Sequence, residues 1–220
     1  MPSSGSCPRR LVLLRHGRTE WNQAGRAQGH ADVELDPVGH AQAAAAASYL
    51  STHQPAAIWS SDLARARETA TYLERETDLC AKADARLREY DVGKRQGLTI
   101  PEFAEAFPQE YAVWVDGTQM PEAPEAENAA DVEARMVPAL REYLSSLDTG
   151  ETGIVVTHGA SMKVALTALL GWSTDLAVDL RGMDNCAWAT LEELAYGGRL
   201  RLAGYNEKAP LDFASGGPVG

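Results

Sequence analysis

Short apolar runs alternate with amphipathic segments along this chain of 220 residues. Residues 10–15 (RLVLLR) form a continuous apolar stretch between two arginines, which is typical of a strand buried on both faces of a parallel sheet. The stretches 56–60 (AAIWS) and 153–158 (GIVVTH) have the same character. The pattern therefore predicts three buried strands.

A helical segment follows each of these strands. Asp36 and Pro37 supply an N-cap and a first-turn proline for the alanine-rich stretch after the first strand. Ser61 or Asp62 is expected to cap the helix after the second strand, and the helix after the third closes on Gly171.

Repeated strand–loop–helix units predict an α/β fold, a three-layer α/β/α sandwich around a mostly parallel central sheet. The segments 186–194 (CAWATLEEL) and 198–206 (GRLRLAGYN) predict a hairpin that adds an antiparallel strand at the sheet edge. We expect one domain over 1–220, with flexible tails at about 1–9 and 207–220.

Two stretches lack a clear period. Residues 17–34 are rich in Gly, Asn, Gln and Asp and predict a loop. Residues 108–128 predict a loop-rich insertion over the site, and whether it acts as a lid is left open.

Charge and cysteine usage narrow the class of protein. The formal net charge is −11 and the pI about 4.9, which argues against nucleic acid or an anionic membrane as partner. Cys7, Cys80 and Cys186 are far apart, as expected of reduced thiols rather than of a disulfide framework or zinc site. No apolar run is long enough for a signal peptide core or a membrane span, so we expect a cytoplasmic protein.

Polar residues follow each predicted strand: Arg15-His16, Ser60-Ser61 and His158-Gly159. The carboxyl ends of parallel strands meet at one edge of the sheet, where ligands bind in such folds. We therefore expect these residues to form one site.

The residue types there suit phosphoryl transfer. A neutral imidazole such as His16 can attack phosphorus, while Arg15 and Arg65 offer bidentate donors to phosphate oxygens. Gly17 would let the backbone approach the phosphate, and His158 would be a further donor. Glu89 is a candidate acid for the leaving group, since a bound phosphate favours its protonated form.

Taken singly, each residue also has a structural interpretation. A histidine at a strand end is more often structural than nucleophilic, and Arg65 and Arg67 could belong to a solvated helix face. They cannot both point into one site, because residues i and i+2 lie on different faces of a helix. The functional interpretation depends on the whole set.

The set resembles a known family. LVLLRHGRTEWN (11–22) resembles the signature of the histidine phosphatase superfamily, also called phosphoglycerate mutase-like. SSDLARARETA (60–70), LREYDVGKRQG (87–97) and VVTHGASMK (155–163) resemble its later motifs, in the same order.

The resemblance implies a role for each residue. His16 would carry the phosphoryl group as phosphohistidine, and Glu89 would donate the leaving-group proton and later activate water. Arg15, Arg65 and His158 would bind the phosphate. The resemblance also implies a small phosphomonoester substrate, no metal or other cofactor, and a homodimer. The residues expected to assist at the phosphate or substrate are Gly17, Asn22, Gln28, Gly29 and Gly159.

Two positions depart from the family pattern. Arg95 occupies a place where many phosphatases of the family have tryptophan, and Ala126-Glu127-Asn128 replaces the usual Gly-Glu-Ser. Both departures bear on substrate preference more than on chemistry. Arg26, Lys94 and Arg95 could contact a substrate carboxylate or simply lie on the surface.

The resemblance favours a phosphatase over a mutase, because Trp114 is followed by Val115-Asp116 instead of the mutases' pair of arginines. Segments 181–188 (RGMDNCAW) and 204–206 (GYN) resemble the C-terminal part of glucosyl-3-phosphoglycerate phosphatases, which makes that sugar phosphate the expected substrate. The alternatives are a broad phosphomonoesterase, an α-ribazole or phosphoserine phosphatase, a phosphoglycerate mutase, and a non-catalytic module that binds a phosphorylated ligand.

Overall fold

A computed structural model describes residues 7–115, 123–173, 179–194 and 198–210. The strands are β1 (Arg10–Arg15), β2 (Ala57–Ser60), β3 (Lys82–Ala83), β4 (Thr152–Thr157), β5 (Trp188–Glu193) and β6 (Leu200–Glu207). The α-helices are α1 (Glu20–Gln23), α2 (Pro37–Ser51), α3 (Ala64–Thr77), α4 (Ile100–Ala106), α5 (Pro108–Val115), α6 (Ala129–Ser145) and α7 (Gly159–Leu170). Two 3₁₀ turns, η1 (Ala85–Leu87) and η2 (Gly93–Arg95), lie between β3 and α4.

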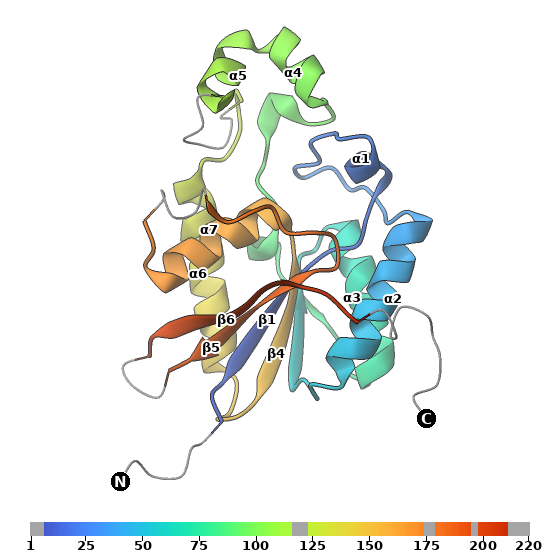
Figure 1. Ribbon diagram of the computed structural model, residues 1–220, viewed down its shortest axis with the longest axis vertical. Helices are drawn as coiled ribbons and strands as arrows, with labels where there is room; N and C mark the ends of the chain where they lie inside the picture. The colour runs from blue at the N-terminus through green and yellow to red at the C-terminus, as the bar shows by residue number, and fades with distance from the viewer. Residues whose placement is uncertain (1–6, 116–122, 174–178, 195–197, 211–220) are drawn as a thin grey trace.

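The six strands form one mixed sheet in the order β3-β2-β4-β1-β5-β6 (Figure 1). β1, β2, β3 and β4 pair in parallel, and β5 runs antiparallel to both β1 and β6. The predicted fold class and the C-terminal hairpin at the sheet edge are confirmed. The parallel pairing brings the carboxyl ends of β2, β4 and β1 side by side.

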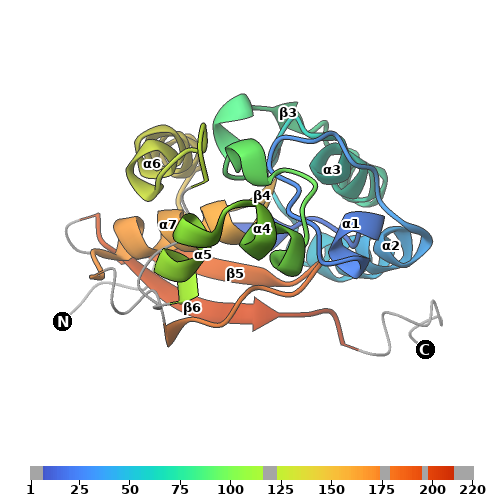
Figure 2. The same ribbon diagram turned by 90° about the horizontal axis from the view of Figure 1, so that it is seen from above.

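Helices cover both faces of the sheet, α2 and α3 on one side and α6 and α7 on the other (Figure 2). Successive residues of β1 serve the two layers in turn. Leu11 and Leu13 pack with the α6 and α7 side chains, while Val12 and Leu14 pack with those of α2 and α3. All four are at most 1% exposed, so β1 is a rigid support for the residues that follow it.

The predicted ends of two helices are confirmed. The Asp36 carboxylate accepts a 2.7 Å hydrogen bond from the Gly39 amide, and Pro37 opens α2. α7 ends at Gly171, whose φ of 65° lies in the left-handed region that glycine adopts without strain.

The predicted cap of α3 is wrong. The helix begins at Ala64 after Leu63, which has no capping side chain. Its first amide instead donates to the carboxylate of Asp32, 2.6 Å away and 32 residues earlier in the chain. A cap from a distant loop leaves no local sequence signal.

Both stretches predicted as loops contain helix. One turn, α1, lies within 17–34 and is closed by a capping box between Thr19 and Asn22. Residues 108–115 of the predicted insertion form α5, which lies with α4 beyond the carboxyl ends of the strands (Figure 1). Val113 and Val115 are more than 60% exposed, so the apolar positions of α5 do not follow a buried face. Residues 116–122 of that insertion lie outside the described residues.

The two ends of the described chain are each held by an ion pair. Arg9 forms an ion pair with Glu193, with a 2.7 Å N–O distance. Lys208 forms one with Asp184 at 2.8 Å. The rest of the predicted tails, 1–6 and 211–220, lies outside the described residues.

Candidate active site

The polar residues after the parallel strands meet at one edge of the sheet. His16 follows β1 and His158 follows β4, and their ring centroids are 5.2 Å apart. A cavity of about 150 Å³ opens beside His16. The predicted site residues that line it are Arg15, His16, Asn22, Gln28, Gly29, Arg65 and Glu89.

His16 is held as a neutral imidazole with a defined tautomer. Its Nδ1 lies 2.7 Å from the carbonyl oxygen of Gly17. A carbonyl can only accept, so the proton is on Nδ1 and Nε2 carries a free lone pair. Burial, followed by the neighbouring guanidinium groups of Arg65 and Arg15, holds the pKa of His16 well below its ordinary value. The ring is therefore uncharged at neutral pH, with a lone pair on Nε2 that can attack an electrophile.

Arg65 is completely buried and fixed from three directions. Its Nη1 donates to the carbonyl of Ala31 and its Nη2 to that of Gly29, each at 2.8 Å. Its Nε donates to Nδ1 of His158 at 3.2 Å. Burial lowers the pKa of Arg65 to about 10, so the group stays cationic at neutral pH. Each terminal nitrogen keeps a second N–H for a ligand.

Arg15 places a second cation beside His16. Its Nη1 donates to the carbonyl of Met183, and its Nε is buried without a hydrogen-bond partner. Burial lowers the pKa of Arg15, although the nearby Glu89 carboxylate opposes the shift. A buried guanidinium with an unused N–H is suited to receive an anion.

Glu89 lies between η1 and η2, and its side chain faces these cations beside the first turn of α7. Its carboxylate accepts hydrogen bonds from the amides of Ala160 at 3.0 Å and Ser161 at 2.7 Å. Its own carbonyl is held by Nη2 of Arg135 at 3.0 Å and by Nε2 of His30 at 2.9 Å. The carboxyl group is thus fixed at the wall of the cavity.

This geometry coincides with a match to a family model. The model described as histidine phosphatase superfamily (branch 1) matches residues 11–207. The chain belongs to the histidine phosphatase superfamily. The family and the phosphatase enzyme class predicted from the motifs are confirmed.

The chain is also similar to individual members. It is 39% identical to a glucosyl-3-phosphoglycerate phosphatase of Mycolicibacterium vanbaalenii, over 83% of this chain and 84% of the relative. It is 39% identical to a metal-independent phosphoserine phosphatase of Arabidopsis thaliana, over 70% of this chain and 65% of the relative. A solved structure of mycobacterial glucosyl-3-phosphoglycerate phosphatase with VO3 superposes with a TM-score of 0.82 at 36% identity, covering 90% of this chain and 98% of that one.

His158 of this histidine phosphatase does not line the cavity. Its Nδ1 accepts from Nε of Arg65, so the ring proton is on Nε2, which donates to Oγ of Ser61 at 2.9 Å. Burial, Arg65 and His16 hold the pKa of His158 well below its ordinary value. The ring therefore positions Arg65, and its role as a direct phosphate donor stays a prediction.

Gly17 and Gly159, the two predicted glycines that do not line the cavity, lie where a Cβ would come close to a neighbouring group. A Cβ on Gly17 would lie 2.5 Å from the carbonyl oxygen of Gly39 at the start of α2. The Gly17 amide donates to Oγ1 of Thr69 at 3.0 Å rather than pointing at a ligand. A Cβ on Gly159 would lie 3.3 Å from Nε of Arg15, which makes this glycine a close neighbour of that side chain. The expected backbone approach of Gly17 to phosphate stays a prediction.

Asn22, Gln28 and Gly29 form a further part of the lining. Oδ1 of Asn22 accepts from the Thr19 amide and from Nδ2 of Asn185, both at 3.2 Å. Oε1 of Gln28 is buried without a hydrogen-bond partner. Gly29 has a φ of 51°, and a Cβ there would lie 2.6 Å from Val92, so only glycine fits.

Sequence reasoning gave no site role to the segment 183–187. Asn185 donates from Nδ2 to the carbonyl of His16 at 3.1 Å, and the Cys186 amide donates to the carbonyl of Arg15 at 3.2 Å. The segment therefore holds the backbone of Arg15 and His16 in place. Residues 181–188 resemble part of the sequence of related phosphatases, but no local sequence pattern predicts these contacts. The rest of the lining is formed by Arg26, Ala27, Tyr90, Val92, Arg95 and Ala160.

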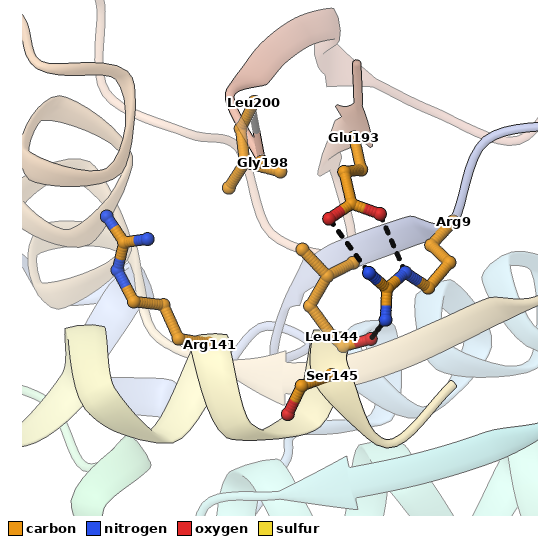
Figure 3. Close-up of a pocket in the computed structure, with 7 residues that line it drawn as sticks. All are labelled: Arg9, Arg141, Leu144, Ser145, Glu193, Gly198 and Leu200. Carbon is orange, nitrogen blue, oxygen red and sulfur yellow. Dashed lines mark hydrogen bonds and ion pairs between the residues drawn. The ribbon is translucent and has the colours of Figure 1, made fainter. Parts of the chain in front are cut away.

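A second cavity, of about 120 Å³, lies near the amino end of β1 (Figure 3). The guanidinium of Arg9 there is engaged by the Glu193 carboxylate and the Leu144 carbonyl. None of the described residues lining this cavity is a histidine or cysteine. The described residues that line this cavity do not include a group of histidine, arginine and glutamate side chains like the one around His16.

The residues that the structure describes contain no group of three or more histidine, cysteine or acidic side chains arranged to hold a metal ion. No helix within those same ranges has the length and apolar character needed to cross a bilayer.

Proposed function

We propose that this histidine phosphatase hydrolyses glucosyl-3-phosphoglycerate to glucosylglycerate and inorganic phosphate through a phosphohistidine on His16. The observation that carries the chemistry is the neutral His16 ring, with its Nε2 lone pair free beside the cationic Arg15 and Arg65. The substrate is supported by the 39% identity to a phosphatase of that name and by the similar fold of its solved relative.

In the first step, Nε2 of His16 attacks phosphorus and the bond between phosphorus and the ester oxygen breaks. The second N–H groups of Arg65 and the free Nε–H of Arg15 stabilise charge on the transferring phosphoryl oxygens. Glu89, in its protonated form, gives its proton to the leaving alkoxide. The products of this step are phosphohistidine, the free alcohol and the Glu89 carboxylate.

In the second step, water attacks the phosphohistidine. The Glu89 carboxylate takes a proton from the water while the P–N bond breaks. Inorganic phosphate leaves, and both His16 and Glu89 return to their starting forms. Because Nδ1 keeps its hydrogen bond to Gly17, the regenerated ring has its lone pair on Nε2 again.

Phosphoserine is the second candidate substrate, favoured by the similarity to the Arabidopsis enzyme. The other phosphomonoesters considered from the sequence are further targets for the same assay. Mutase activity is disfavoured by Val115-Asp116 in place of paired arginines. The homodimer, the cytoplasmic location and the lack of a cofactor requirement stay predictions.

The test is a rate comparison in EDTA on glucosyl-3-phosphoglycerate, phosphoserine and p-nitrophenyl phosphate. We expect wild-type protein to turn over the first substrate with the highest kcat/KM, and His16→Ala to lose about a thousandfold or more on all three, because the nucleophile is gone. His53→Ala is the matched control, since His53 is exposed beyond the end of α2.

Three results would contradict parts of the proposal. Activity that survives in pure His16→Ala protein rules out the phosphohistidine. A higher kcat/KM for phosphoserine replaces the proposed substrate while leaving the mechanism in place. Activity that requires an added divalent metal removes the metal-free mechanism.

A further inference from the structure

Asn185 bonds two groups of the site and has no part in the steps above. It precedes β5 in the chain and is not among the described residues that line the cavity. Its Nδ2 donates to the carbonyl of His16 at 3.1 Å and to Oδ1 of Asn22 at 3.2 Å. Both N–H bonds of this amide group are therefore used, and one side chain connects the proposed nucleophile to a residue of the cavity lining.

The chemistry of two backbone groups fixes the direction of these hydrogen bonds. The carbonyl of His16 can only accept, so the atom of Asn185 that contacts it must be the amide nitrogen. The Thr19 amide can only donate, so its partner on Asn22, 3.2 Å away, must be the amide oxygen. The hydroxyl of Thr19 lies at the same distance from that oxygen. Asn185 is therefore the donor and Asn22 the acceptor in the contact between them.

These contacts leave one half of the Asn22 amide for a ligand. Its Oδ1 accepts from the Thr19 amide, the Thr19 hydroxyl and Asn185. Its Nδ2 donates to no acceptor within the part of the chain that the structure describes, although the side chain lines the cavity. The two N–H bonds of Nδ2 suit an anion, whereas the oxygen of the same group would repel one. The contribution of Asn22 thus depends on which way its amide is turned.

A reversed Asn22 amide would face donors with a donor. Its NH2 group would then lie against the amide of Thr19, which is completely buried, and against Nδ2 of Asn185. Buried donors without an acceptor are costly, so both contacts favour the orientation with Oδ1 turned away from the ligand. Thr19 is a local partner within the α1 cap, while Asn185 reaches Asn22 from 163 residues further along the chain.

We propose that Asn185 is a positioning residue for phosphate binding: it holds Oδ1 of Asn22 and so turns the Asn22 NH2 group toward the phosphoryl oxygens. The inference rests on the proposed function, because it takes the anion in the cavity to be the phosphoryl group. Asn185 acts through Asn22 and does not itself touch the phosphate. Its second hydrogen bond, to the carbonyl of His16, fixes the donor relative to the proposed nucleophile.

The test is a double-mutant cycle on the binding of inorganic phosphate, measured by titration calorimetry on the full chain. Asn185→Leu keeps the approximate shape of the side chain and removes both N–H bonds. We expect it to raise the Kd of phosphate about fivefold, because the Asn22 amide is then less firmly oriented. In an Asn22→Ala background the same substitution should raise the Kd by no more than about twofold, since the group that it orients is gone.

Asn185→Asp gives a second cycle that keeps the shape and reverses the hydrogen bond. Its carboxylate can only accept, so it attracts the NH2 group of Asn22 and turns Oδ1 toward the phosphate. The added negative charge also repels phosphate, but this part of the effect remains in the Asn22→Ala background and cancels in the cycle. We expect a coupling with Asn22 at least as large as that of Asn185→Leu. This cycle also decides the question if the leucine variant does not fold.

Asn206→Ala is the matched control. Asn206 lies on β6 and supports the same segment without contacting Asn22, because its Oδ1 accepts from the Asp184 amide at 2.8 Å. Any change that it causes in the Kd of phosphate should be the same with and without Asn22, within about twofold. Urea unfolding of every variant shows that the titrated proteins are folded.

Equal effects of the Asn185 substitutions with and without Asn22 would overturn the inference. An equally strong coupling from Asn206→Ala would also overturn it, since the backbone of the segment would then be responsible. Absence of coupling in a protein whose hydrolysis depends on His16 leaves the proposed function intact. Coupling in a protein that fails to hydrolyse glucosyl-3-phosphoglycerate supports the role of Asn185 and refutes the proposed substrate alone.

Discussion

The ring of His16, the proposed nucleophile of this histidine phosphatase, is oriented by a backbone carbonyl and not by an acidic side chain. The 2.7 Å contact from Nδ1 of His16 to the Gly17 oxygen fixes the tautomer without adding negative charge near the phosphate. A carboxylate in that place would repel the bound dianion and raise the pKa of the ring. The carbonyl orients the ring and leaves Arg15 and Arg65 as the dominant charges beside it.

Glu89→Gln is expected to separate two classes of substrate. Gln keeps the size of the side chain but cannot donate a proton to the leaving oxygen, so alkyl phosphates should lose about 10²-fold to 10⁴-fold in kcat. p-Nitrophenyl phosphate has a leaving group that needs little protonation and should lose far less. Steady-state rates of the variant on glycerol 3-phosphate and p-nitrophenyl phosphate measure the difference. Equal losses on both would assign the acid role to another residue.

Residue types and spacing predicted most of the cavity lining because each of those residues follows a strand or lies in a family motif. The partners of each residue were not predictable in the same way. The ring of His158 bonds Arg65 and Ser61, and the carbonyl of His16 is held by Asn185 from 169 residues away. Such contacts depend on how distant segments meet, which leaves no trace in a short motif.

At the scale of elements, buried strands and their helices were predictable, whereas short surface helices were not. β1 and β4 are continuous apolar runs, and Asp36 and Gly171 mark helix ends locally. α5 exposes Val113 and Val115, so it lacks the periodicity that identifies a helix. α3 takes its cap from Asp32, which no local pattern indicates.

Asn128→Ala should weaken α6 without affecting catalysis. Asn128 is the N-cap of α6 and forms a capping box with Asp131. The side chain of each residue accepts a 3.0 Å hydrogen bond from the backbone amide of the other. Losing the cap costs about 1 kcal/mol of unfolding free energy. Asn128→Ser, which restores the residue usual in the family, should cost much less because serine is also a good cap. Urea unfolding of the two variants measures this, and equal stabilities would show that the cap contributes nothing.

At the scale of the whole molecule, the active site makes stability depend on pH. His16 and His158 are buried, and their folded-state pKa values lie well below the unfolded value near 6.5. Below pH 6.5 the unfolded chain binds more protons than the folded protein, so the unfolding free energy falls as pH is lowered. Acidic groups with lowered pKa values, such as Asp84 at about 2, change the unfolding free energy at lower pH than the histidines do.

His16→Asn should therefore flatten the pH dependence of stability. Wild-type protein is expected to lose about 1 kcal/mol for each of the two histidines between about pH 7 and pH 5.5, and the variant should lose about half as much. Urea unfolding at the two pH values measures the change. The same loss in both proteins would show that His16 is protonated in the folded state over this range.

The contacts behind the nucleophile also bear on how the enzyme is made in the cell. His16 is synthesised long before the residues that support it. The Asn185 side chain that donates to its carbonyl follows 169 residues later, and the Ala187 carbonyl that accepts from the Arg15 amide comes after that. β1 is paired on that side only once β5 exists. The site can therefore be aligned only once the chain has been made through β5, and a nascent chain stalled between residues 163 and 185 carries every motif of the site without the contacts that hold His16.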